Sequence, residues 1–134
     1  MGRVGLLDAA RRWADEWAAA WREHDAARVA ALYTPGADFR SSPFREPREA
    51  GDYAAWAFES EAPGADVRFG EPLLVEPDRA AVEYWAVVRD ADGAETTIAG
   101  VALLRFDADG LVVEQRDYWH ELEGGREPHP RWGR

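Results

Sequence analysis

Hydrophobic positions in the second half of the chain alternate with polar ones over three runs, about 79–89, 94–107 and 111–120. A period of two is typical of β-strands that bury one face. Asp-Ala-Asp-Gly occurs between the runs at 90–93 and again at 107–110. Because aspartate and glycine favour tight turns, we predict an antiparallel meander of three strands.

Treating each turn as a four-residue hairpin loop fixes the register of these strands. Arg89 then pairs with Ala94, and Phe106 pairs with Leu111. Because side chains alternate between the two faces of a strand, three rows of residues share one face. The rows are Glu83, Gly100 and Asp117, then Trp85, Ile98 and Trp119, then Ala81, Ala102 and Gln115.

The central row predicts the floor of a pocket. Neighbouring strands lie about 4.8 Å apart, so Glu83 and Asp117 should project from positions roughly 10 Å apart, across the gap at Gly100. The other face of the first strand carries an apolar strip, Val82, Tyr84, Ala86 and Val88. Such a strip is too apolar to face water, so it predicts a partner surface and a symmetric homodimer.

The first half of the chain has helical periodicity. Residues 5–22 carry Trp13, Trp17 and Trp21 at intervals of four, which predicts an amphipathic helix. Aromatic residues at this spacing are more often core than ligand contacts, although some of these rings could line a cavity.

Four further elements complete the expected order. They are a short helix from Asp25 to Pro35-Gly36, an extended piece at 37–44, a helix at about 48–60, and a strand at about 65–76 interrupted at Pro72. Helices followed by strands predict an α+β fold, in which helices cover one face of a bent antiparallel sheet. We assign residues 1–122 to one domain and residues 123–134 to a C-terminal tail.

Composition narrows the function classes. With 46% hydrophobic residues and seven tryptophans among 134 residues, the chain is long and apolar enough for one folded domain. Its net charge of −10 argues against a nucleic-acid or anionic-membrane partner. A small neutral or weakly charged ligand fits this charge better.

Missing residue types exclude several chemistries. The chain contains no cysteine and no lysine, so thiol nucleophiles, thiolate metal sites and Schiff bases are excluded. Its histidines, His24, His120 and His129, lack metal-ligand spacing, and we expect neither a metal nor a cofactor. We find no signal-peptide pattern and no apolar run of membrane-spanning length, so we expect a cytoplasmic protein.

Several short strings, taken in order, resemble one known superfamily. They are Trp21-Arg22-Glu23-His24-Asp25, Ala31-Leu32-Tyr33, Ala37-Asp38-Phe39, Ala81-Val82-Glu83-Tyr84-Trp85, 104–112 and Arg116-Asp117-Tyr118-Trp119. Over about residues 8–120 the chain resembles the nuclear transport factor 2-like superfamily, and more narrowly its bacterial SnoaL-like proteins.

The resemblance implies a cone-shaped barrel, in which a strongly curved sheet wraps around the first helix and leaves a cavity. It also implies that members commonly form dimers through the convex face of the sheet. The positions that it turns toward the cavity have the same parity as those from the hairpin register. They are Glu83, Trp85, Val87, Gly100, Ala102, Leu104, Gln115, Asp117 and Trp119.

Known catalytic positions of the superfamily are only partly present. Where ketosteroid isomerases have their catalytic residues, this chain has Trp17, Ser41 or Ser42, and Ala102. Polyketide cyclases of the SnoaL type use an aspartate near the end of the last strand, and Asp117 lies there. Their histidine partner has no counterpart, and no arginine on this wall completes the Asp-Arg-Asp relay of limonene epoxide hydrolases.

We therefore assign acid/base roles to Asp117 and Glu83, whose pKa values an apolar site would raise. Both carboxylates could instead be satisfied by arginine or by main-chain donors. His120 falls on the opposite face from Asp117, so a direct dyad is not expected. The predicted ligand-binding residues are Trp17, Tyr33, Phe39, Trp56, Trp85, Gly100, Ala102, Gln115 and Trp119.

Two functions follow from these assignments. The first is an enzyme without cofactor that performs isomerisation, cyclisation, dehydration or hydrolysis on a small hydrophobic molecule. The second is a non-catalytic binding or accessory module, in which the two carboxylates orient a polar end of the ligand. A rate that depends on a perturbed carboxylate pKa would distinguish the enzyme from the binding module.

Overall fold

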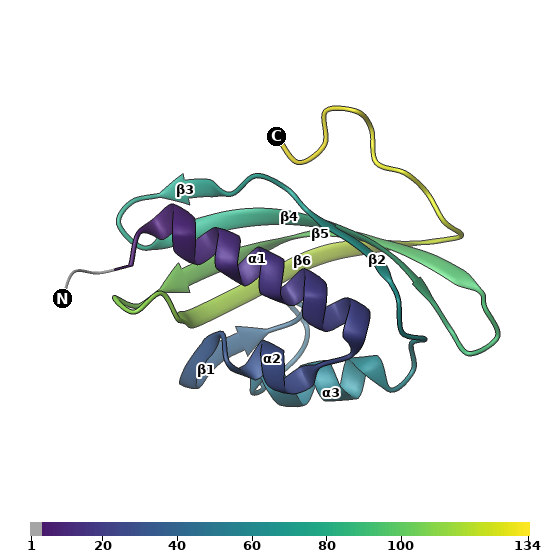
Figure 1. Ribbon diagram of the computed structural model, residues 1–134, viewed down its shortest axis with the longest axis horizontal. Coiled ribbons are helices and arrows are strands. Elements are labelled where there is room, and N and C mark those ends of the chain that lie inside the picture. The colour runs from purple at the N-terminus through teal and green to yellow at the C-terminus, as the bar shows by residue number, and fades with distance from the viewer. Residues whose placement is uncertain (1–3) are drawn as a thin grey trace.

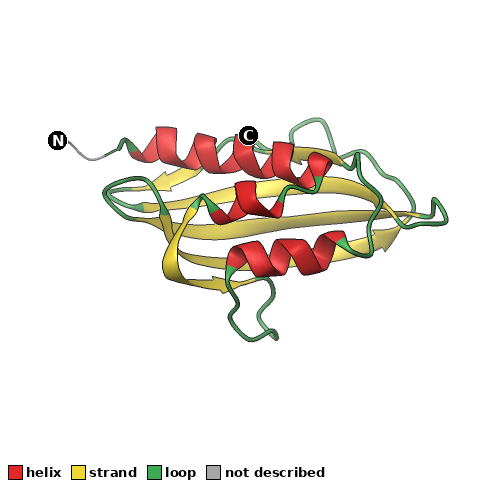
Figure 2. Ribbon diagram, turned by 60° about the horizontal axis from the view of Figure 1, so that its bottom comes forward, coloured by secondary structure: helices red, strands yellow, loops and turns green. Residues whose placement is uncertain are grey.

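The computed structural model describes residues 4–134, in which helices cover one face of a single curved sheet (Figures 1 and 2). The helices are α1 (Leu6–Glu23), α2 (Ala26–Ala30) and α3 (Ala50–Phe58). The strands are β1 (Tyr33–Arg40), β2 (Asp66–Phe69), β3 (Leu73–Val75), β4 (Arg79–Arg89), β5 (Glu95–Phe106) and β6 (Val112–Glu123). The predicted α+β class is confirmed.

The six strands form one sheet in the order β1-β6-β5-β4-β2, with β3 also paired to β4. The long strands β4, β5 and β6 make the predicted antiparallel meander, whereas β1 runs parallel to β6. The sheet stays open and curves around α1, as the cone-shaped architecture requires (Figure 1).

One predicted helix is shorter than expected. Its periodicity extended to Pro35, but α2 ends at Ala30 because Tyr33 already starts β1. Gly36 has a φ of 76°, which only glycine adopts easily, and the β1–β6 register shifts between Tyr33 and Asp38. Pairing with β6 therefore decides the conformation of this segment.

The register between β4 and β5 differs by one residue from the predicted one. Arg89 pairs with Glu95, which leaves a loop of five residues rather than four. Inside it the Asp90 carboxylate accepts from the backbone N–H of Asp92 and of Ala94, at 2.9 and 3.0 Å. One extra loop residue turns every side chain of β4 to the other face relative to β5.

The register between β5 and β6 differs by two residues. Phe106 pairs with Val112, and a bulge next to it pairs Arg105 with Glu114. Asp117 therefore lies opposite Ala102 instead of Gly100. Because a shift of two preserves the face, β5 and β6 keep the predicted orientation.

These two shifts decide which predictions hold. Asp117 faces the concave side, as predicted, but Glu83 and Trp85 lie on the convex side, so their predicted cavity positions are wrong. The prediction of an apolar strip on the convex face is wrong as well. Val82 and Ala86, two of its residues, are buried in the core and 0% exposed. The homodimer loses that support and stays a prediction.

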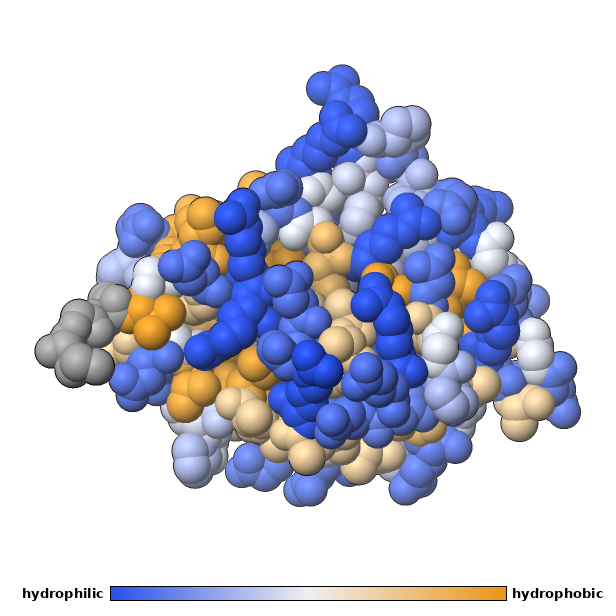
Figure 3. All heavy atoms as spheres, in the orientation of Figure 1, coloured by the Kyte–Doolittle hydropathy of each residue, from blue (hydrophilic) through white to orange (hydrophobic). Residues whose placement is uncertain are grey.

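The helix α1 lies across the concave face and places its tryptophans inward. Trp13 and Trp17 are buried in the main core cluster, as the stripe predicted. Its outer side belongs to the mostly hydrophilic face in Figure 3, where apolar atoms gather toward the end of the molecule at β3. Among residues 4–134, no helix combines the length and apolarity needed to cross a membrane.

The C-terminal segment folds back onto the convex face instead of leaving the domain (Figure 1). The Trp85 indole N–H donates to the Arg126 carbonyl at 2.7 Å, and the Trp132 ring meets Trp85 edge-on at 6.0 Å. The backbone N–H of Glu71 donates to the Gly133 carbonyl at 2.6 Å. The tail therefore covers part of the sheet face that we expected a partner to cover.

Candidate functional site

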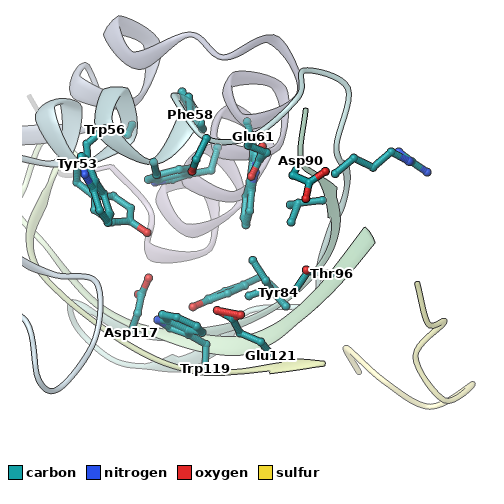
Figure 4. Close-up of a pocket in the computed structure, with 18 of the residues that line it drawn as sticks. Tyr53, Trp56, Phe58, Glu61, Tyr84, Asp90, Thr96, Asp117, Trp119 and Glu121 are labelled. Atoms are coloured by element: carbon teal, nitrogen blue, oxygen red, sulfur yellow. The ribbon is translucent and has the colours of Figure 1, made fainter. Parts of the chain in front are cut away.

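A cavity of about 320 Å³ lies between the concave face of the sheet and helices α1 and α3 (Figure 4). Aromatic side chains form much of its wall. They are Trp13, Trp17, Trp21, Tyr53, Trp56, Phe58, Phe69, Tyr84 and Trp119. Such a wall suits an apolar ligand, and a few polar groups break it at defined places.

Asp117 is one of the polar groups on the sheet side of the cavity. Its carboxylate Oδ1 accepts a hydrogen bond from Gln115 Nε2 at 2.9 Å. Burial raises the pKa of Asp117 to about 7, although the Gln115 amide and the Tyr84 hydroxyl both favour the ionised form. An aspartate with this pKa exchanges its proton near neutral pH, which general acid/base catalysis requires.

A one-way chain of hydrogen bonds orients Asp117. The Tyr33 hydroxyl accepts from the indole N–H groups of Trp13 and Trp17, at 3.1 and 2.7 Å. It therefore donates its own proton to Gln115 Oε1, at 2.5 Å. The amide oxygen of Gln115 is thus committed to Tyr33, and its N–H group must face Asp117.

Two tyrosine hydroxyls point toward Asp117, Tyr53 from α3 across the cavity and Tyr84 from β4 in the same sheet (Figure 4). Burial raises the pKa of both phenols, and the charge of Asp117 raises it further. Both tyrosines therefore stay protonated and can donate hydrogen bonds. A ligand oxygen beside Asp117 would find two donors and one proton-accepting carboxylate.

Gly100 lies directly beneath one of these tyrosines. A Cβ at Gly100 would come within 2.6 Å of the Trp119 Cβ and 2.9 Å of the Tyr84 ring. The gap that the sequence predicted between two acids is therefore filled by an aromatic ring. The glycine allows close packing of Tyr84 and contributes no ligand space.

A cationic side chain is fixed at the edge of the cavity. The Arg45 guanidinium lies between the rings of Trp56 and Trp119, at 5.4 and 5.5 Å from their centroids. Arg45 also donates to Ser41 Oγ, and the Trp119 indole donates to the Ser41 carbonyl at 2.6 Å. These contacts hold the loop after β1 against the sheet.

A second carboxylate, Glu61, lies on the helix side of the cavity. Its oxygens accept from the Trp21 indole at 2.9 and 3.1 Å, and Oε2 lies 3.2 Å from His24 Nε2. Burial raises the pKa of Glu61, against the opposing effect of these two partners. Asp117 and Glu61 thus place carboxylates on two different walls of the cavity, whose lining also includes Asp90 and Glu121.

The predicted catalytic and ligand-binding residues separate into three groups. Five predicted residues line the cavity, namely Trp17, Trp56, Gln115, Asp117 and Trp119. Four lie buried behind its wall or beneath a lining ring, namely Tyr33, Phe39, Gly100 and Ala102. The remaining two, Glu83 and Trp85, lie on the convex face, and their assignment to the cavity is wrong because β4 is turned over.

The polar lining residues that sequence reasoning did not assign to the site include Arg45, Tyr53, Glu61 and Tyr84. Tyr84 was within reach, because a five-residue loop after Arg89 would have placed it inward. Glu61 lies in a turn after α3, where no periodic pattern indicates direction. Among residues 4–134, no group of three or more histidine, aspartate and glutamate side chains is arranged to hold a metal ion.

Comparison with known proteins gives a family and a fold. A family model described as the SnoaL-like domain matches residues 14–115. No curated protein sequence matches the chain.

Several solved structures share the architecture. An LEH-like epoxide hydrolase of Mycobacterium tuberculosis is 14% identical, with a TM-score of 0.67 over 85% of this chain and 84% of that one. The epoxide hydrolase/cyclase-like enzyme SalBIII, described with a role in pyran ring formation in the polyether salinomycin, is 17% identical, with a TM-score of 0.68 over 86% and 95%.

The Δ5-3-ketosteroid isomerase of a Mycobacterium species is 16% identical, with a TM-score of 0.64 over 90% of this chain and 100% of that one. At these identities the likeness of all three proteins shows the fold alone.

Proposed function

We propose that this chain, which belongs to the SnoaL-like domain family, binds a small and largely apolar molecule and transfers a proton on it with Asp117. The observation that carries the proposal is the setting of Asp117. Its carboxylate faces an aromatic cavity, is oriented by the Tyr33–Gln115 chain and has a pKa raised to about 7. Structural acids are usually paired with arginine, whereas this one is held by neutral donors.

The proposed step uses only side chains of this chain. Ionised Asp117 removes a proton from a carbon or a hydroxyl of the ligand. Tyr53 and Tyr84 donate hydrogen bonds to the oxygen on which negative charge develops, and protonated Asp117 then returns the proton. Isomerisation, cyclisation and epoxide opening all contain such a step, and the names of the structural neighbours are compatible with this class.

Glu83 has no part in this proposal, because it lies on the convex face. The second candidate function is a binding module, in which Asp117, Tyr53 and Tyr84 only orient a polar end of the ligand. The aromatic wall supports it as well as it supports an enzyme. Catalysis has to be tested by proton transfer and not by affinity.

The test is hydrogen exchange on a bicyclic ketone, 2-decalone, in heavy water. Wild type should exchange the hydrogens next to the carbonyl above background, with a rate that rises with pH through about 7. Asp117→Asn should lower the enzymatic rate by about 10²–10⁴ and keep ketone affinity within a few-fold. Glu83→Gln, the matched control, should exchange at the wild-type rate.

Binding of the ketone without exchange above background would favour the binding module. Equal exchange rates in wild type and Asp117→Asn would remove Asp117 from the mechanism.

For assembly we propose a homodimer through the part of the convex face that the tail leaves open. Tyr118 and Leu122 are each 44% exposed there and lie on the same face of β6. Exposed apolar residues on one sheet face suit a second copy of the same surface.

A further inference from the structure

Glu61 is held in the cavity wall by two side chains of the helix layer, and neither is an arginine. The Trp21 indole N–H donates to the carboxylate at 2.9 Å, and His24 Nε2 lies 3.2 Å from Oε2. Among residues 4–134, His24 is the only basic side chain within 4.0 Å of this carboxylate. Among the described residues, Glu61 therefore has no arginine within ion-pair distance.

The geometry around Glu61 is fixed by packing. His24 ends α1 in the left-handed region, with a φ of 57°, and its ring stacks on Phe58 at 4.6 Å with an interplanar angle of 0°. The Glu61 side chain is 12% exposed and borders the cavity beside Phe58 and Trp21. Aromatic side chains next to a carboxylate favour a hydrophobic amine, because the rings contact its apolar part while the carboxylate attracts its charge.

The arginines in the cavity wall do not neutralise Glu61. Arg89 Nη2 lies 2.7 Å from the Glu95 carboxylate oxygen Oε2. Arg45 is held between two tryptophan rings at the far edge of the cavity. Figure 4 shows Glu61 on the helix side, away from Asp117 on the sheet side. The two carboxylates can therefore contact different parts of one ligand.

We propose that Glu61, with Trp21 and Phe58 beside it, binds a protonated amine of the ligand while Asp117 faces the reacting end. This rests on the proposed function, because it assigns the second end of the same cavity. The proposed substrate is therefore a compact hydrophobic amine, whose ammonium group donates a hydrogen bond to Glu61.

Two probes of equal size test this proposal. They are 2-(2-naphthyl)ethylamine and 2-(2-naphthyl)ethanol, titrated calorimetrically at pH 8, where the amine is protonated. Wild type should bind the amine about tenfold more tightly than the alcohol, as one charge-assisted hydrogen bond predicts. Glu61→Gln should lose about tenfold in amine affinity and keep alcohol affinity within about twofold.

The alcohol also reports folding, because glutamine can still accept from Trp21 and His24 and the cavity keeps its shape. Asp117→Asn should retain the preference for the amine. A preference that survives Glu61→Gln overturns the proposal and assigns the cation to Asp90 or Glu121, which also line the cavity.

Loss of the preference in Asp117→Asn would overturn the proposal too, by making Asp117 the cation site. Equal affinity of wild type for both probes, or binding of neither, likewise overturns it. None of these results alters the ketone exchange measurement, so the proposed function is judged separately.

Discussion

The two faces of the sheet carry similar residues in opposite settings. On the concave face, Asp117 lies in an aromatic cavity, and burial raises its pKa to about 7. On the convex face, Glu83 and Trp85 project from β4, and the C-terminal segment folds over Trp85. A carboxylate two residues before a tryptophan is therefore no signature of a site. The face to which the strand turns that carboxylate decides its chemistry.

The hydrogen-bonded network on the concave face should be the most sensitive to mutation. Tyr33→Phe removes the acceptor of two buried indole N–H groups and the donor to Gln115. We expect a loss of about 3 kcal/mol in the free energy of unfolding, since several buried polar groups lose partners. Chemical denaturation measures this loss.

The matched control is Tyr118→Phe on the convex face, where the ring is 44% exposed. It should change stability by no more than about 0.5 kcal/mol. Equal effects of the two substitutions would contradict the contrast between the faces.

The next largest effect concerns Gly100, between Tyr84 and Trp119. Gly100→Ala places a Cβ 2.6 Å from the Trp119 Cβ and 2.6 Å from the Tyr118 carbonyl oxygen. We expect a loss of about 2 kcal/mol from overpacking, measured by thermal or chemical denaturation. Gly5→Ala is the control, because among residues 4–134 its added methyl group meets only the Asp8 carboxylate, at 3.6 Å. An unchanged free energy of unfolding in Gly100→Ala would show that the neighbouring strands move apart at little cost.

The raised pKa of Asp117 predicts how stability depends on pH. The folded state keeps this proton up to about pH 7, whereas an aspartate in the unfolded chain loses it near 3.8. The folded state binds more protons between these values, so the free energy of unfolding should fall as pH rises through this window.

Asp117→Asn should remove that fall. We expect the variant to match wild type near pH 4 and to be about 1–2 kcal/mol more stable at pH 8, because solvent screening would reduce the full effect of the pKa shift. Glu83→Gln should keep the wild-type dependence, since it leaves Asp117 in place. A pH profile of Asp117→Asn that parallels wild type would assign the dependence to another group.

The smallest effect should come from the convex face. Deleting residues 124–134 removes the hydrogen bond from Trp85 to Arg126 and the contact with Trp132. We expect a stability loss of about 1 kcal/mol and stronger self-association, because Trp85 becomes exposed.

Sedimentation of the truncated and full-length chains measures this association. Full-length protein that sediments as a 15.0 kDa monomer at micromolar concentration would contradict the proposed homodimer.

The sequence by itself determined the elements and the family. Period-two alternation and two Asp-Ala-Asp-Gly turns specify β4, β5 and β6, and the tryptophans at intervals of four specify α1. These signals are local, because they depend on which face of each element is apolar. The same locality placed Asp117 and Gln115 on one wall, since both lie on β6, two residues apart.

Tertiary structure decided what local pattern could not. A single extra loop residue after Arg89 sent Glu83 outward and Tyr84 inward, and turn sequences alone do not fix loop length to one residue. Glu61 lies in the cavity wall because the segment after α3 packs against α1, beside Trp21 and His24. The C-terminal segment packs on the convex face because Trp85 projects there and its indole N–H donates to the Arg126 carbonyl. Each outcome depends on contacts between segments far apart in sequence, and periodicity within a segment carries no information about them.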